Sequence, residues 1–251
     1  AADAAVRDSR YCYQNYVEFL QRHVTEAGRD AVVLESPDEA LKGLKALQSF
    51  RLLCSNRSGL LGSHHLNELL SARLRERLGG SVQTRGWYPG RVVVVTRNNY
   101  SLGLFNGQVG FTAYWQPPAG PDGELPRPEL RVFFEQEGQN SGAQPEPGEE
   151  RAPLIIVNPA FLEEVEDGLA LTVHKAQGSE YEYVGLLLSD RADNPVLTRE
   201  LVYTGITRVQ KGLKLYASWE ALLGACGRHV IRQSALGERI RALLYQDEAG
   251  A

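Results

Sequence analysis

The hydrophobic positions in the first eighty residues recur at helical spacing. Apolar side chains three and four residues apart predict amphipathic helices. One start signal is explicit, because Ser36-Pro-Asp-Glu39 is a capping box with proline at the first helical position. Ser63 is a second candidate cap, and Gly79-Gly80 is a termination signal. The pattern predicts helices over residues 11–24, 36–50 and 63–78, with a short buried strand over 51–55.

The middle of the chain has a different pattern, with short apolar runs separated by turn residues. Four consecutive valines, Val92 to Val95, favour a buried strand, and Asn98-Asn99 and Asn106-Gly107 are turn signals. Strands are predicted over residues 91–97, 109–115, 130–134 and 154–157. Since no helix is predicted here, residues 88–162 are interpreted as a small all-β insertion of barrel or SH3-like type.

After the insertion, predicted strands alternate with predicted helices. The strands lie over residues 184–188 and 213–218, and the helices over 198–208, 219–225 and 231–245. This alternation is typical of a parallel sheet that helices cover on both faces, and therefore of an α/β fold. The expected division is 1–87 for the first part of the α/β unit, 88–162 for the insertion and 163–251 for the second part.

Composition narrows the class of protein without identifying it. The chain has 43% hydrophobic and 23% charged residues, as an ordinary globular protein has. The longest apolar runs fall far short of the roughly 20 residues of a membrane span, and the first ten residues have no signal-peptide core, so we expect a cytoplasmic protein. Three scattered cysteines argue against a disulfide framework and against a metal site. The absence of methionine indicates part of a longer chain.

Two segments beside predicted strands are rich in polar and charged residues. The first is Leu171-Thr-Val-His-Lys-Ala-Gln-Gly-Ser-Glu180-Tyr181, in which the small Ala176 and Gly178 would let a ligand approach the backbone closely. The second is Arg199-Glu-Leu-Val-Tyr-Thr-Gly-Ile-Thr-Arg208. An arginine at the end of a helix and beside hydroxyl groups suits a phosphate contact, because its guanidinium is a rigid and permanently charged fork. A bland alternative for Arg208 is a cation that stabilises a helix C-terminus.

Four segments, in this order, resemble motifs of superfamily 1 helicases. Thr172 to Glu180 is similar to motif V and Leu201 to Arg208 to motif VI, while Leu52-Leu-Cys-Ser-Asn-Arg57 resembles motif IV. Trp87-Tyr-Pro-Gly-Arg91 and the segment 97–107 resemble the RecD branch, the alpha chain of bacterial exodeoxyribonuclease V. The resemblance covers roughly residues 50–220. It implies the second RecA-like motor domain (of P-loop NTPase type), with an SH3-like insertion, of an ATP-dependent DNA helicase in double-strand break repair and recombination.

The resemblance also implies roles for individual residues. Arg208 would be an arginine finger at the γ-phosphate of ATP, and Arg57 a second cation at the same phosphate. Glu180 would accept a hydrogen bond from the ribose, with Gln177 and Gly178 near the nucleotide. The residues implied to face single-stranded DNA are Thr172, His174, Asn98 and Asn106. The two asparagines are also plausible turn formers, and Glu180 and His174 have ordinary surface interpretations.

The first motor domain is not part of this sequence, and alternatives therefore stay open. There is no Gly-Lys dipeptide and so no P-loop, and no metal-binding acidic pair follows a strand. ATP and Mg²⁺ would be bound mainly by that first domain, and the chain alone should not hydrolyse ATP. Implied partners are single-stranded DNA, the first motor domain, and RecB-like and RecC-like subunits. A free-standing RecD-like helicase and a non-catalytic DNA-binding or docking module remain the alternatives.

Overall fold

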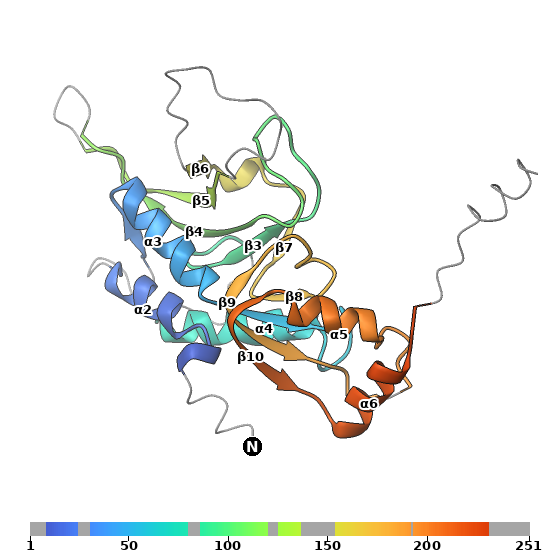
Figure 1. Cartoon of the computed structure of the whole chain (residues 1–251). Helices are drawn as coiled ribbons and strands as arrows, with labels where there is room; N and C mark the ends of the chain where they lie inside the picture. Colours follow the sequence, from blue (N-terminus) through green and yellow to red (C-terminus); the bar gives the residue numbers. More distant parts are fainter. Residues whose placement is uncertain are drawn as a thin grey trace, which may run out of the picture.

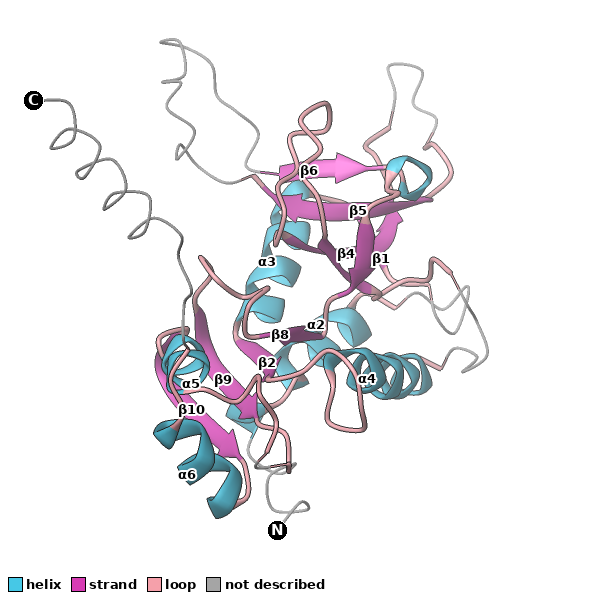
Figure 2. Cartoon of the chain, turned by 90° about the vertical axis from the view of Figure 1, so that its right-hand side faces the viewer, coloured by secondary structure: helices cyan, strands magenta, loops and turns pink. Residues whose placement is uncertain are grey.

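The computed structural model contains two β-sheets with helices packed against them (Figure 1). It describes residues 9–24, 31–79, 86–119, 125–136, 154–191 and 193–230. One sheet is parallel and holds the strands that flank the two polar segments. The other is largely antiparallel and lies above the parallel sheet in the view of Figure 2.

The parallel sheet has the strand order β10-β9-β2-β8, and each neighbouring pair is parallel. Its strands are β2 (Phe50–Cys54), β8 (Ala170–Thr172), β9 (Tyr181–Leu187) and β10 (Val209–Tyr216). The helices that follow its strands are α4 (Ser63–Arg77) after β2, α5 (Arg199–Ile206) after β9, and α6 (Trp219–Gly227) after β10. The predicted alternation of strands and helices, and the α/β class, are thereby confirmed.

Both faces of the parallel sheet carry packed side chains. Leu201 of α5 is buried in one cluster with Val184 of β9 and with side chains of α6. On the opposite face, Tyr13 packs edge-to-face on Phe50, with ring centroids 5.0 Å apart. Because alternate residues of a strand point to opposite faces, β9 contributes to both layers.

The second sheet has the order β6-β5-β4-β3-β7, and β1 pairs with β4 off this path. Its strands are β1 (Val33–Leu34), β3 (Val92–Val95), β4 (Val109–Trp115), β5 (Glu129–Glu135), β6 (Leu154–Val157) and β7 (Val165–Asp167). All pairs are antiparallel except the parallel pair β1–β4. The four predicted strands are confirmed, but the sheet also takes in β1 and β7, which lie outside residues 88–162.

Helices α2 (Gln14–Arg22) and α3 (Pro37–Gln48) cover the antiparallel sheet, whereas the 3-10 turn η1 (Ser9–Tyr11) lies on β9 of the parallel sheet, where Tyr11 contacts Tyr183. Phe19 and Leu44 of these helices belong to one buried cluster with Phe111 of β4 and Phe133 of β5. The Ser36 cap is confirmed, because its hydroxyl accepts a hydrogen bond from the Glu39 N–H at 3.3 Å; the Glu39 carboxylate accepts from the Glu35 N–H at 2.8 Å and not from the Ser36 N–H of a regular capping box.

Three sequence-based details need correction. Ser63 is the first helical residue of α4 and Gly62 is its cap, because backbone carbonyls of residues 56 and 57 already accept from the first N–H groups of the helix. α3 ends at Gln48, since Phe50 begins β2. The stretch 88–162 is not free of helix, because η2 (Pro159–Phe161) forms a 3-10 turn.

One further expectation falls outside the described residues, because the helix expected over 231–245 lies beyond them. Within the described part of the chain, no helix has the length and apolar character that a membrane span requires.

Candidate functional site

The loop that joins β8 to β9 is a tight turn with an exposed polar surface. The Thr172 hydroxyl accepts from the Lys175 N–H at 3.3 Å, and the Ala176 N–H donates to the Thr172 carbonyl at 3.2 Å. Val173 and Ala176 are buried and anchor the loop in the core of the parallel sheet. Gly178 has φ +88°, which favours glycine. The apolar residues therefore fix the loop, while the polar residues between them face outward.

Arg208 lies directly against this loop. Its guanidinium donates to the Ser179 carbonyl at 3.2 Å and to the Thr204 carbonyl at 3.3 Å. The backbones are also joined, because the Tyr181 N–H donates to the Arg208 carbonyl at 2.9 Å. The last turn of α5 and the glycine-containing loop thus meet at the amino ends of β9 and β10. These contacts hold the side chain half-buried, and a carbonyl neutralises none of its charge.

The residues predicted to lie near a nucleotide are grouped around the same loop. Gln177, Gly178 and Glu180 are exposed. The Glu180 carboxylate accepts from the side-chain amide of Gln210 at 3.2 Å, which ties it to the start of β10 next to Arg208. The structure therefore brings Arg208, Glu180 and the glycine loop together on one surface. Their roles toward a nucleotide stay a prediction.

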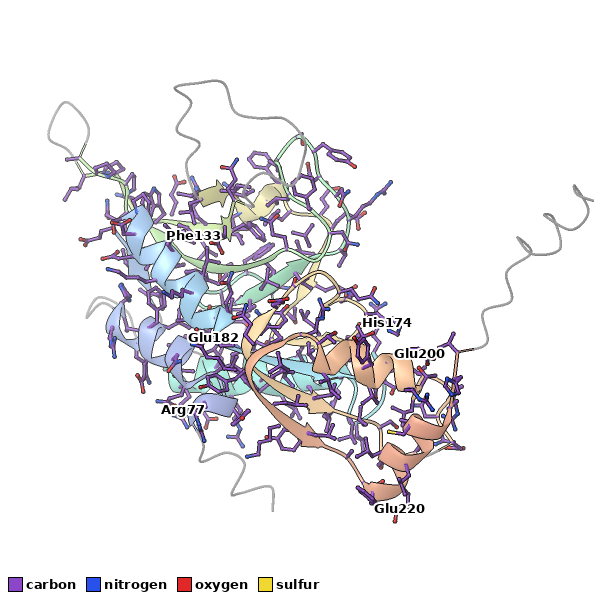
Figure 3. All side chains as sticks on the ribbon, viewed as in Figure 1. Arg77, Phe133, His174, Glu182, Glu200 and Glu220 are labelled. Atoms are coloured by element: carbon purple, nitrogen blue, oxygen red, sulfur yellow. The ribbon has the colours of Figure 1, made fainter. Side chains whose placement is uncertain are left out.

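The residues predicted to face DNA lie on two adjoining turns. The Asn98 side chain accepts from the Asn106 N–H at 2.8 Å, which closes the turn-rich segment between β3 and β4. A Cβ at Gly107 would lie 3.6 Å from the Lys175 carbonyl, so this segment contacts the β8–β9 loop. In Figure 3, exposed His174 lies between the antiparallel sheet and α5. Asn98 is therefore a turn former, as anticipated, and contact with DNA remains untested.

Arg57 is not placed beside Arg208. Its guanidinium forms an ion pair with Glu166 of β7 at 3.1 Å. Arg57 follows the carboxyl end of β2, whereas Arg208 directly precedes β10 at the amino end of the sheet. Strand β9 between these ends spans about 20 Å at the usual rise per residue. The structure thus separates two residues that were expected at one phosphate.

Glu166 binds a second cation from the β8–β9 loop. The Lys175 ammonium lies 2.7 Å from the carboxylate. Burial raises the pKa of Glu166, but the hydrogen bond and charge of Lys175, together with Arg57 and His64, outweigh burial and lower the pKa below its ordinary value. Beside this cluster is a cavity of about 290 Å³, lined by polar groups that include Thr172 and Asn67.

Asn67 of α4, which the sequence did not single out, fixes the position of β8. Its buried side chain donates to the Ala170 carbonyl at 2.8 Å and to the Asp167 carbonyl at 2.9 Å, and it accepts from the Ala170 N–H at 2.7 Å. These bonds pair backbone groups at the outer edge of the parallel sheet, where β8 has no further strand neighbour among the described residues. Glu166 was missed as well, because its partner Arg57 is 109 residues away and no local pattern pairs it with Lys175. Among the described residues, no cluster of His, Cys, Asp or Glu could hold a metal ion.

Comparison with known proteins connects this arrangement to helicases. Residues 167–216 match the model of the UvrD-like helicase C-terminal domain, and this range contains the glycine loop, α5 and Arg208. The chain is 34% identical over 214 residues to the RecBCD enzyme subunit RecD of Mycobacterium tuberculosis (strain ATCC 25618 / H37Rv), covering 85% of this chain and 32% of that protein. It is 32% identical over 194 residues to the ATP-dependent RecD2 DNA helicase of Deinococcus radiodurans, covering 76% of this chain and 23% of that protein.

Among solved structures, Pif1 helicase from Bacteroides in complex with ADP-AlF3 and ssDNA is similar to this chain, with a TM-score of 0.39 and 15% identity. That match covers 95% of this chain and 55% of that one.

The family match and the curated relatives point to one class: residues 167–216 are similar to a helicase C-terminal domain, and the relatives are RecD proteins, one of them named as a DNA helicase. Within that class, the resemblance to RecD proteins is confirmed. The chain spans about a third of the length of the RecD subunit of M. tuberculosis, which it covers to 32%.

Proposed function

We propose that this chain is the second motor-domain portion of a RecD-like, ATP-dependent DNA helicase that translocates on single-stranded DNA. In this proposal the parallel sheet with α4, α5 and α6 is a RecA-like domain, and the antiparallel sheet is an SH3-like insertion. The proposed domain limits are 1–87, 88–162 and 163–251, with β1 and β7 of the flanking segments pairing onto the sheet of the insertion. The observation that carries the proposal is the contact of the Arg208 guanidinium with the Ser179 carbonyl, 3.2 Å away.

Arg208 is suited to sense a nucleotide bound by another domain. Its side chain is oriented by neutral acceptors, two carbonyls and the Thr207 hydroxyl, and it pairs with no carboxylate of the described residues. The full charge is therefore available to the γ-phosphate of ATP when a first motor domain closes on this surface. Arginine fingers of phosphoryl-transfer enzymes contribute roughly 10³ to 10⁵ in rate. Glu180, held beside the start of β10, would accept from the ribose, and Gln177 and Gly178 would border it.

The nucleotide and its Mg²⁺ would be bound mainly by the first motor domain. The chain alone is then not expected to hydrolyse ATP. Thr172, His174, Asn98 and Asn106 would contact the backbone of single-stranded DNA, which is a sequence-independent and salt-sensitive mode of binding. The second expected phosphate cation, Arg57, fits the nucleotide site less well, because it is paired with Glu166 at the other end of the sheet.

The cellular setting proposed is a cytoplasmic complex with RecB-like and RecC-like subunits, the setting of exodeoxyribonuclease V in double-strand break repair and recombination. A free-standing RecD-like helicase is the second candidate, and the similarity to the RecD2 DNA helicase of D. radiodurans favours it to a comparable degree. Co-purification of the full-length protein from its own cells distinguishes them, since the first candidate requires nuclease and scaffold subunits in stoichiometric amounts.

The finger assignment is tested by replacing Arg208 in the full-length protein. Arg208→Ala and Arg208→Lys should each lower DNA-stimulated ATP turnover by about 100-fold or more, because lysine cannot reproduce the fork. The affinity for oligo(dT) should stay within about twofold. The matched control is Arg199→Ala, which removes the arginine at the start of α5, whose side chain also contacts a backbone carbonyl, that of Cys226 at 3.1 Å. Normal ATP turnover in both Arg208 variants would refute the assignment.

A further inference from the structure

Glu166 joins two cations that come from separate parts of the chain. Arg57 belongs to the loop after β2 and Lys175 to the loop after β8, while Glu166 lies on β7 of the other sheet. The carboxylate is 3.1 Å from the arginine and 2.7 Å from the lysine. Its side chain is 41% exposed, so the carboxylate can leave its two partners without crossing a packed core.

Three cations, Arg57, Arg91 and Lys175, and three carboxylates, Glu68, Glu166 and Asp167, line the cavity beside this cluster. Arg91 and Asp167 form their own pair at 2.8 Å. Glu68 lies 3.8 Å from the ring of His65 on the same helix turn. Arg57 and Lys175 therefore share one carboxylate, that of Glu166. A carboxylate that serves two cations is a weaker counter-ion than a phosphate, which offers more acceptor oxygens to an arginine fork and a lysine.

The location of the cavity points to the source of such a phosphate. Thr172 lines it, and Lys175 sits on the loop that the turn at Gly107 approaches. These are the two turns that carry the residues proposed to contact DNA. The cavity volume of about 290 Å³ is far more than the roughly 15 Å³ that one water requires, so there is room for a solvated phosphate.

We propose that this cavity is a phosphate subsite for the backbone of single-stranded DNA, and that the Glu166 carboxylate occupies its cations until DNA displaces it. A phosphodiester would accept from the Arg57 guanidinium and the Lys175 ammonium, and Glu166 would turn to solvent. The carboxylate thus competes with DNA and lowers its affinity. This inference rests on the proposed function, because it assumes that DNA passes over these turns.

The test compares oligo(dT) binding by the chain and its variants as the salt concentration is changed. Glu166→Gln removes the competing charge and should tighten binding roughly 3- to 10-fold at low salt. The slope of log K against log salt should steepen by about 0.7 to 1.4, since each of the two freed cations that meets a phosphate of single-stranded nucleic acid adds about 0.7. The matched control is Glu182→Gln, which breaks an exposed lysine pair of the same length, 2.7 Å, with Lys211.

The cations supply the second half of the test. Lys175→Gln should weaken binding and make the salt slope shallower by about 0.7. Lys175→Gln combined with Glu166→Gln should lose the gain seen with Glu166→Gln alone. A merely structural role of Glu166 predicts a lower melting temperature without a steeper slope. If Glu166→Gln and Glu182→Gln bind with the same affinity and slope as the unmodified chain, the subsite does not exist.

Two further outcomes separate the possible errors. If ATP with Mg²⁺ displaces oligo(dT) from the unmodified chain but not from Lys175→Gln, the phosphate belongs to a nucleotide and the inference is overturned while a nucleotide function stands. If neither the unmodified chain nor any variant binds oligo(dT) at low salt, the DNA part of the proposed function is wrong, and this inference falls with it. The proposal is supported if Glu166→Gln binds oligo(dT) with a steeper salt dependence and if ATP with Mg²⁺ does not change that binding.

Discussion

Replacing Asn67 by alanine tests how α4 holds the edge of the parallel sheet. The substitution removes three hydrogen bonds of 2.7 to 2.9 Å and leaves an N–H and two carbonyl groups of the β7–β8 segment without their partner. A typical internal hydrogen bond contributes about 1 kcal/mol net, and buried groups left unpaired cost more. Asn67→Ala should therefore lower the free energy of unfolding by about 2–4 kcal/mol.

Urea and thermal unfolding followed by tryptophan fluorescence measure this loss. For a protein of this size it corresponds to a melting temperature lowered by about 4–16 °C. Asn67→Asp should be no milder, because a carboxylate would face the two carbonyls to which the amide donates. The control is Asn15→Ala at an exposed position of α2, which removes one hydrogen bond of 3.2 Å to Ser49 and should change stability by at most about 0.5 kcal/mol. A loss below about 1 kcal/mol for Asn67→Ala would mean that water replaces the amide and that β8 is not held by α4.

Two further predictions concern the core and the cysteines. Gly43→Ala should destabilise the chain by about 1–3 kcal/mol, although alanine is the better helix former, because the new Cβ would lie 2.6 Å from the Phe111 ring. The control is Gly227→Ala, which should be neutral in the same urea titration because nothing lies within 4 Å of its new Cβ. Equal effects of the two substitutions would contradict the packing described for Gly43. Burial raises the pKa of the Cys54 thiol to about 12, so little reactive thiolate forms there at pH 8. Iodoacetamide at pH 8 should therefore modify exposed Cys226 within minutes and Cys54 only in denaturant. Equal rates of modification, measured by peptide mass spectrometry, would disprove this.

The parts of the fold that follow from local chemistry could be predicted from the sequence. The cap at Ser36 needs only residues within one helical turn, and its bond to the Glu39 N–H is present. The strand predicted over 109–115 has the bounds of β4, since alternating apolar residues between two turns specify it locally. The parallel sheet followed from the order of strands and helices.

The parts that depend on distant partners could not be predicted. Strands β1, β7 and β8 have two or three residues each, too few for a periodic pattern, and they form because neighbouring strands offer free edges. Asn67 and Glu166 are ordinary polar residues in the sequence. The partners of Asn67 and the Arg57 partner of Glu166 are about 100 residues away, and the Lys175 partner of Glu166, nine residues away, lies on a different sheet's loop. For the candidate site, the resemblance indicated which residues to compare, and folding then placed Arg208 and Arg57 at opposite ends of one sheet.

Strand β2 occupies the interior of a sheet whose other members are all made later. Its residue Leu52 is flanked by Ala170 on one side and Gly185 on the other. At a synthesis rate of 5–20 residues per second, the roughly 120 residues between the first two take about 6 to 24 seconds to emerge. During that interval the nascent chain carries a strand with both edges unpaired, because β8 and β9 have not yet been made. An exposed strand edge is a site at which chains aggregate, so β2 is the strand that most needs protection while this protein is being synthesised.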